Sequence, residues 1–122
     1  MCGISGVIAF TDKGLSALKN TDVATDCLQK RGPDKSGIFR DSRVAFGHTR
    51  LSIIDTSDAA SQPMSDAGGR YTIVFNGEFF NFKEHRDFVL SQGITLKSES
   101  DTEVLLYLYI LEGEKCLERV NG

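Results

Sequence analysis

Cys2 is the residue in this chain whose type and place most clearly suggest chemistry. Once the initiator Met1 is removed, Cys2 carries both a thiol and a free α-amine. A thiol titrates near ~8.5 and an α-amine near ~7.7–8.0, so part of the amine is unprotonated at neutral pH and can accept the thiol proton. Other cysteine enzymes recruit a separate histidine for this step. We expect Met1 to be removed and Cys2 to be a nucleophile with its own base. Position alone also allows a small apolar residue in a buried first strand.

Five further short motifs lie along the chain. These motifs are Arg31-Gly32-Pro33-Asp34, Gly47-His48-Thr49-Arg50-Leu51-Ser52-Ile53-Ile54-Asp55, Gln62-Pro63-Met64, Phe75-Asn76-Gly77-Glu78 and Ser100-Asp101-Thr102-Glu103. The planar guanidinium of Arg50 suits a carboxylate, which it can bind with two parallel hydrogen bonds. Two motifs also have structural interpretations. Asn76-Gly77 is a strong hairpin signal, and Ser100 to Glu103 has the composition of a helix start.

Composition excludes several classes of protein. The chain has 122 residues, which is one domain at most, with 40% hydrophobic and 25% charged residues, as in ordinary globular proteins. The net charge is -3 without a basic cluster, which argues against nucleic acid as a partner. No apolar run approaches the ~18 residues of a membrane span, so we expect a cytoplasmic protein that binds no membrane. Three cysteines without a CxxC pair, and two histidines without ligand spacing, predict neither a disulfide framework nor a metal site.

The residue pattern predicts strands and helices in separate groups, which is typical of an α+β fold. In the first half of the chain we expect a strand over 4–10, a turn over 11–14, a helix from about 15 or 21 to 30, and a hairpin of 38–40 with 44–48. An apolar stretch over 51–54 and a loop over 56–70 should follow. In the second half we expect a hairpin of 71–75 with 78–80, helices over 83–92 and 102–112, and a last turn over 116–120. Cys27 falls on the apolar side of the first helix, so we expect it in the core. His85 lies on a charged helix face and is expected to be solvated. No glycine-rich phosphate-binding loop is present in the sequence.

The six motifs, counted from Met1-Cys2-Gly3-Ile4 and taken in order, resemble the glutaminase domain of the class II glutamine amidotransferases. The greatest similarity is to the glutamine-hydrolysing asparagine synthetases, and it covers essentially the whole chain. The resemblance implies an N-terminal-nucleophile hydrolase fold, a four-layer αββα sandwich with two antiparallel sheets between helical layers, incomplete here at the C-terminal end. Residues 1–122 would then be the N-terminal part of a glutaminase domain, with the synthetase domain absent.

The resemblance also implies roles for particular residues in hydrolysing the glutamine side-chain amide. Cys2 would form a γ-glutamyl thioester, and the Asn76 side-chain amide and the Gly77 N–H would stabilise the oxyanion. Substrate-binding positions would be Arg50 at the α-carboxylate, Glu78 and Asp101 at the α-ammonium, and Leu51 and Ile53 in the same run as Arg50. We assign a structural role to Arg31-Gly32-Pro33-Asp34. His48 is interpreted as a core histidine outside the site.

The resemblance implies no cofactor in this domain, with ATP and Mg belonging only to the missing synthetase domain. L-glutamine and that synthetase domain are the implied partners, and a homodimer is one of the open oligomeric states. Three alternatives stay open. The chain could be a catalytically silent fragment that binds glutamine or a partner chain, the glutaminase half of another class II amidotransferase, or a redox thiol protein.

Overall fold

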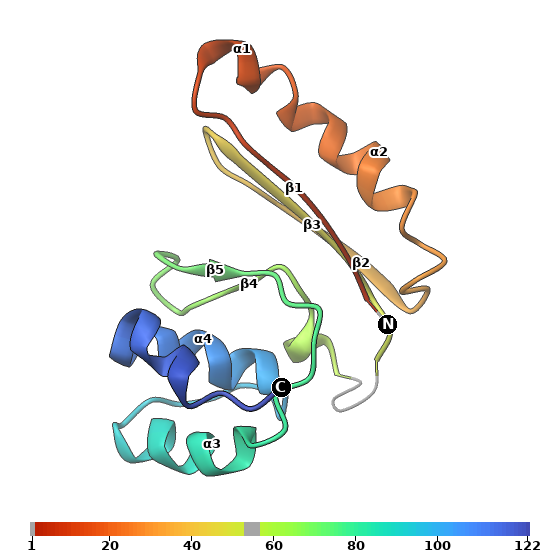
Figure 1. Cartoon of the computed structure of the whole chain (residues 1–122). Helices are drawn as coiled ribbons and strands as arrows, with labels where there is room; N and C mark the ends of the chain where they lie inside the picture. Colours follow the sequence, from red (N-terminus) through yellow and green to blue (C-terminus); the bar gives the residue numbers. More distant parts are fainter. Residues whose placement is uncertain (1, 53–56) are drawn as a thin grey trace. The chain divides into compact units, whose positions relative to one another are not determined.

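A computed structural model describes residues 2–52 and 57–122, which divide into two compact units (Figure 1). The first unit runs to Ser52 and also includes Ser61–Pro63 and Val74–Asn76. The second comprises the described residues 57–60 together with Met64–Ile73 and Gly77–Gly122. Each unit combines helices with an antiparallel sheet, so the predicted α+β class with antiparallel sheets is confirmed.

The first unit is built on a three-stranded antiparallel sheet. Its strands are β1 (Gly3–Ile8), β2 (Lys35–Arg40) and β3 (Val44–Arg50), in the order β1-β3-β2. Gly3 pairs with Thr49, and Lys35 pairs with Arg50. The first predicted strand and the first predicted hairpin are therefore confirmed, as alternating apolar residues and the polar turn between β2 and β3 indicate.

Helices cover one face of this sheet (Figure 1). They are α1 (Asp12–Leu15), the 3₁₀ turn η1 (Leu18–Asn20) and α2 (Thr21–Asp26). The Thr25 hydroxyl lies 2.7 Å from the Ser5 hydroxyl, which joins α2 to β1. Two predictions were wrong here. Residues 12–15 form a helical turn because the Thr11 side chain caps it. Cys27 is exposed because the buried face of α2 is the one that carries Thr21 and Thr25, and Cys27, still helical in its dihedrals, lies off that face.

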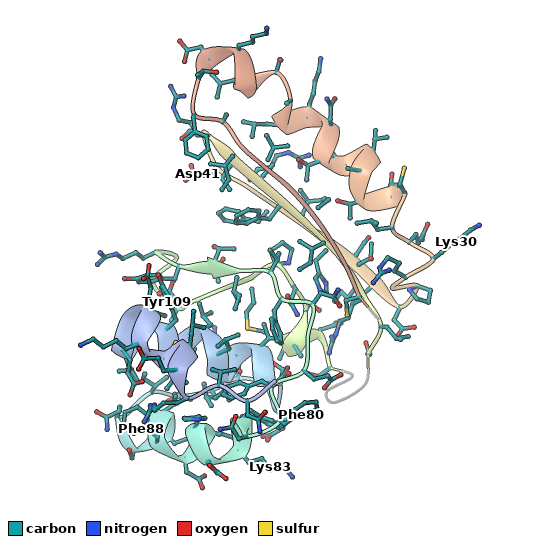
Figure 2. All side chains as sticks on the ribbon, in the orientation of Figure 1. Lys30, Asp41, Phe80, Lys83, Phe88 and Tyr109 are labelled. Atoms are coloured by element: carbon teal, nitrogen blue, oxygen red, sulfur yellow. The ribbon has the colours of Figure 1, made fainter. Side chains whose placement is uncertain are left out.

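The second unit contains two helices and a short hairpin. Its elements are η2 (Asp58–Ala60), β4 (Met64–Ser65), β5 (Thr72–Ile73), α3 (Phe82–Ser91), α4 (Asp101–Glu112) and η3 (Gly113–Glu118). Both helices agree with prediction. The predicted loop over 56–70 was wrong in part, because β4 and η2 lie within it; Asp66 closes the β4–β5 turn by accepting from the Tyr71 and Gly68 N–H groups. Tyr109 of α4, labelled in Figure 2, meets Tyr71 edge-on with ring centres 6.4 Å apart.

The core of the second unit is mainly apolar. Its buried apolar residues are Ala60, Met64, Phe79, Val89, Val104, Leu105, Leu106, Leu108 and Cys116. The only helix of the unit with a long apolar run is α4, and among the described residues no helix is long and apolar enough to cross a membrane. His85 is buried against Phe79, with ring centres 5.4 Å apart, so the expectation of a solvated His85 was wrong.

The predicted hairpin at Asn76-Gly77 was also wrong. A type I′ turn needs positive φ at both central residues, and among the described residues only Gly69, Gly93 and Gly113 have positive φ. Strand β5 ends at Ile73, and the segment after Gly77 instead bonds to the last residues of the chain, with the Phe80 N–H donating to the Asn121 carbonyl at 2.8 Å.

Candidate functional site

Cys2 lies where the register of the first sheet brings it beside the end of β3. Because Gly3 pairs with Thr49 in an antiparallel register, Cys2, just before β1, falls opposite Arg50 and beside Leu51. The Leu51 N–H donates to the Cys2 Sγ at 3.4 Å, and the Sγ lies 3.8 Å from the Leu51 carbonyl oxygen. The thiol is half-buried. Both main-chain polar groups of Leu51 therefore face the thiol.

Arg31 holds the backbone of Cys2 itself. Its Nε donates to the Cys2 carbonyl at 3.1 Å. Three residues on, Asp34 accepts from the Ser52 N–H at 2.7 Å, and its own N–H donates to the Arg50 carbonyl at 3.0 Å. The predicted structural role of this motif therefore has a specific form: it ties the start of β1 and the end of β3 to one loop.

Gly32 explains why the loop can lie so close to β3. A side chain at this position would collide with the backbone of Thr49 and Arg50. Only glycine leaves room for that approach. The contact between Arg31 and Cys2 therefore depends on the glycine at position 32.

Side chains of β3 alternate between the two faces of the first sheet. Thr49 points toward the helices, because its hydroxyl donates to the Leu28 carbonyl at 3.1 Å. His48 and Arg50 consequently share the opposite face, and both are buried. The prediction that His48 is a core histidine is confirmed.

Two effects lower the pKa of His48. Burial is the larger, and the positive charge of Arg50 acts in the same direction, while a hydrogen bond to Phe75 opposes them. Burial and a nearby cation penalise the charged imidazolium, whereas the hydrogen bond to Phe75 favours it. His48 is therefore a neutral imidazole at pH 7, beside a permanent cation.

In the second unit, Asp101 begins α4 and contacts a segment far away in the sequence. Its Oδ2 accepts from the Phe79 N–H at 3.1 Å, and the side chain is buried. The Ser100 hydroxyl caps the helix by accepting from the Glu103 N–H at 3.2 Å. The structural interpretation of this motif as a helix start is correct, and the contact with Phe79 adds a link to the segment that carries Gly77 and Glu78.

Glu103 is a buried carboxylate that sequence reasoning did not single out. It accepts from the Lys97 N–H at 3.0 Å and from the N–H and hydroxyl of Ser98 at 2.7 and 2.6 Å. A Ser followed three residues later by Glu is the signature of a capping box, and this signal was present in the sequence. Here the glutamate reaches further back than a standard capping box, so it fixes the whole loop before α4.

The structure thus groups the predicted site residues by unit. Cys2, Arg50 and Leu51 come together in the first unit, which also contains Asn76, whose side chain is exposed. The second unit contains Gly77, Glu78 and Asp101, of which the first two are exposed. Ile53 lies outside the described residues. Within residues 2–52 and 57–122, no three His, Cys, Asp or Glu side chains gather as a metal site.

Comparison with known proteins identifies the class to which such an N-terminal cysteine domain belongs. A family described as "Glutamine amidotransferase domain" matches residues 1–122, the full length of the chain. The chain therefore belongs to the glutamine amidotransferase domain family.

Individual relatives show which kinds of protein the chain resembles within this family. Asparagine synthetase [glutamine-hydrolyzing] 3 of Bacillus subtilis is 40% identical over 124 residues, and asparagine synthetase [glutamine-hydrolyzing] 1 of the same organism is 38% identical over 127 residues. Amidase chry2 of Gibberella zeae is 32% identical over 133 residues. Each match covers 100% of this chain but only 20% of the relative, so the chain spans about a fifth of their length.

Proposed function

We propose that this chain carries the glutaminase half-reaction of an asparagine synthetase-like enzyme. The observation that carries the proposal is the contact of the Cys2 thiol with the backbone immediately after Arg50, in a chain that matches the amidotransferase family over its whole length. This contact supports the proposal because the candidate nucleophile lies against the main chain of Leu51, the residue that follows Arg50.

The reaction would begin when the Cys2 Sγ attacks the side-chain amide carbon of glutamine. After removal of Met1, the α-amine of Cys2 would take the thiol proton and pass it to the leaving nitrogen. Ammonia leaves and a γ-glutamyl thioester remains. Water then attacks the thioester carbon, which releases glutamate and restores the thiol.

The other predicted residues would bind glutamine and the charge that develops on it. The Asn76 amide and the Gly77 N–H would donate to the oxyanion. Arg50 would bind the α-carboxylate, with Leu51 and Ile53 in the same run. Glu78 and Asp101 would face the α-ammonium.

We further propose that the complete domain is a four-layer αββα sandwich and that residues 1–122 are its N-terminal part. Ammonia would pass to a synthetase domain in the parent protein, where ATP and Mg would activate the acceptor, and the parent could assemble as a homodimer. The similarity to an amidase keeps other acceptors open. A silent glutamine-binding fragment is the competing proposal.

Release of glutamate and ammonia from glutamine tests the proposal. The purified chain should release both in equal amounts, and Cys2→Ala should release neither while keeping its circular dichroism spectrum. Binding of glutamine without release would favour the silent fragment. Full activity in Cys2→Ala would refute the assignment of the nucleophile.

A further inference from the structure

Both main-chain polar groups of Phe75 have side-chain partners within the first unit. Its N–H donates to the Gln62 Oε1 at 2.6 Å, and its carbonyl oxygen lies 3.3 Å from the His48 Nε2. A carbonyl oxygen only accepts, so the proton of the neutral imidazole belongs on Nε2. Phe75 immediately precedes Asn76, whose own side chain is exposed. The described contacts that fix the approach to Asn76 therefore come from Gln62 and His48.

His48 is an unusual choice for a residue with only a packing role. The ring is fully buried, and its Nδ1 has no hydrogen-bond partner among the described residues. Burying an unpaired polar atom is unfavourable, and an apolar side chain would avoid it. Among residues 2–52 and 57–122, the hydrogen bond of the ring is the one to Phe75, and this contact gives a reason for a histidine at this position.

Gln62 reaches Phe75 because β2 has a glycine opposite His48. Gly37 pairs with His48 in the register of β2 and β3. A side chain at position 37 would collide with the Gln62 carbonyl oxygen. The missing side chain therefore lets residues 61–63 lie against the same face of the sheet as His48. Both contacts on Phe75 therefore depend on this one face of the sheet.

We propose that His48 and Gln62 are positioning residues for Asn76, acting through their hydrogen bonds to the main-chain carbonyl and N–H of Phe75. This inference rests on the proposed function, in which the Asn76 amide stabilises the oxyanion. An oxyanion donor is effective only where it is already in place when charge develops. His48 bonds the carbonyl of the peptide that joins Phe75 to Asn76, and Gln62 bonds the N–H of the peptide before it. Fixing these two successive peptide planes limits the directions in which the Asn76 side chain can point.

The test uses pairs of variants that remove or keep each hydrogen bond. His48→Phe keeps a ring but removes the donor, whereas His48→Gln keeps an amide N–H. Gln62→Met removes the acceptor at similar volume, whereas Gln62→Glu keeps an acceptor oxygen. Loss of a complete oxyanion donor lowers kcat by about 10²–10³, so we expect misplacement to lower kcat by about 10-fold or more. KM for glutamine should stay within about 3-fold, and the conservative variants should recover most of kcat.

A double-mutant cycle with Asn76→Ala separates positioning from general stability. If His48 and Gln62 act through Asn76, then adding His48→Phe or Gln62→Met to Asn76→Ala should change kcat by less than about 2-fold. The control is Thr25→Val. Thr25 lies on α2, which covers the opposite face of the same sheet, and its hydroxyl bonds Ser5 and the Thr21 carbonyl. We expect Thr25→Val to reduce stability and leave kcat unchanged.

The outcomes distinguish this inference from the proposed function. A wild-type chain that does not hydrolyse glutamine would overturn both. An Asn76→Ala variant with normal kcat would overturn the oxyanion role of Asn76 and this inference with it, while the glutaminase function would stand. Normal turnover with a large effect of Asn76→Ala, combined with full additivity of the His48 and Gln62 variants, would overturn the positioning role alone. Should His48→Phe not fold, the cycle with Gln62→Met decides the question. Failure of both to fold would assign them to stability and overturn the inference.

Discussion

The two units hold their candidate site residues by different means. In the first unit, strand register and backbone hydrogen bonds place Cys2, Arg50 and Leu51. In the second, buried carboxylates place the start of α4 and the segment after Gly77. A site in the first unit is thus specified by sheet pairing, and a site in the second by individual side chains.

The buried residues follow the same division. Polar side chains, among them His48, Thr49 and Arg50, make up most of the buried set in the first unit, whereas the second has a predominantly apolar core. A buried polar group left without its partner costs about 1–3 kcal/mol, and truncating a buried apolar side chain costs about 2–5 kcal/mol. Because Cys2, Arg50 and Leu51 are in the first unit, substitution of its buried polar side chains should affect glutamine chemistry strongly, whereas substitution in the apolar core of the second should first affect stability.

Arg50→Lys is expected to have the largest effect. An ammonium cannot form the two parallel hydrogen bonds of a guanidinium, so kcat/KM for glutamine should fall by about 10–100-fold, mainly through KM. Steady-state kinetics measures the change, with Arg43→Lys, on an exposed ion pair with Asp12, as the control. An unchanged KM would show that strand register does not place Arg50 at the substrate.

Gly32→Ala tests the approach of the Arg31 loop to β3. The new methyl group would collide with the backbone of Thr49 and Arg50, so the free energy of unfolding should fall by about 1–3 kcal/mol. Denaturant unfolding measures the change. Gly68→Ala, where a methyl group would meet only a side-chain oxygen of Asp66, is the control with a small expected effect. Equal effects of the two substitutions would contradict the close approach.

Glu103→Gln tests the carboxylate that organises the second unit. An amide nitrogen would face donors from Lys97 and Ser98, which should lower the free energy of unfolding by about 1–3 kcal/mol. Glu112→Gln, which loses a partly exposed ion pair with Arg119, is the matched control and should cost at most about 1 kcal/mol. Similar unfolding curves for both variants would contradict the claim that a buried carboxyl group organises the start of α4 in the second unit.

Acid should weaken the first unit through His48. Its pKa is lowered in the folded chain by burial and by Arg50, so below the ordinary value of 6.5 the unfolded chain binds more protons than the folded one. The free energy of unfolding should then decrease as pH falls below 6.5, by at most about 1.4 kcal/mol per pH unit. His48→Gln should remove this part of the pH dependence. Parallel stability profiles for wild type and variant would contradict it.

Sequence reasoning worked best where one periodic pattern determined one element. Alternation predicted β1 and the hairpin of β2 with β3, and helical spacing predicted α3 and α4. It was wrong where a distant contact decided the outcome. The Asn76-Gly77 pair has the composition of a tight turn, but the segment after it bonds to Asn121.

The candidate site shows the same limit. Residue type and position pointed to Cys2, whereas the roles of Arg50 and Asp101 came from the resemblance of their motifs to the family. The contacts of Arg31 with Cys2 and of Gln62 with Phe75 join residues 29 and 13 positions apart, and no local spacing reveals them. His48 was assigned to the core, which is correct, but burial alone does not show which carbonyl its ring faces.

The central claim is that Cys2, once freed of Met1, is the glutaminase nucleophile. The most direct test is the intact mass of the purified chain before and after incubation with the glutamine-like electrophile diazo-oxo-norleucine. We predict loss of Met1 and a single adduct that peptide mapping places on Cys2, with Cys27 and Cys116 unmodified. A chain that retains Met1 and gains no adduct, or an adduct on another cysteine, would contradict the claim.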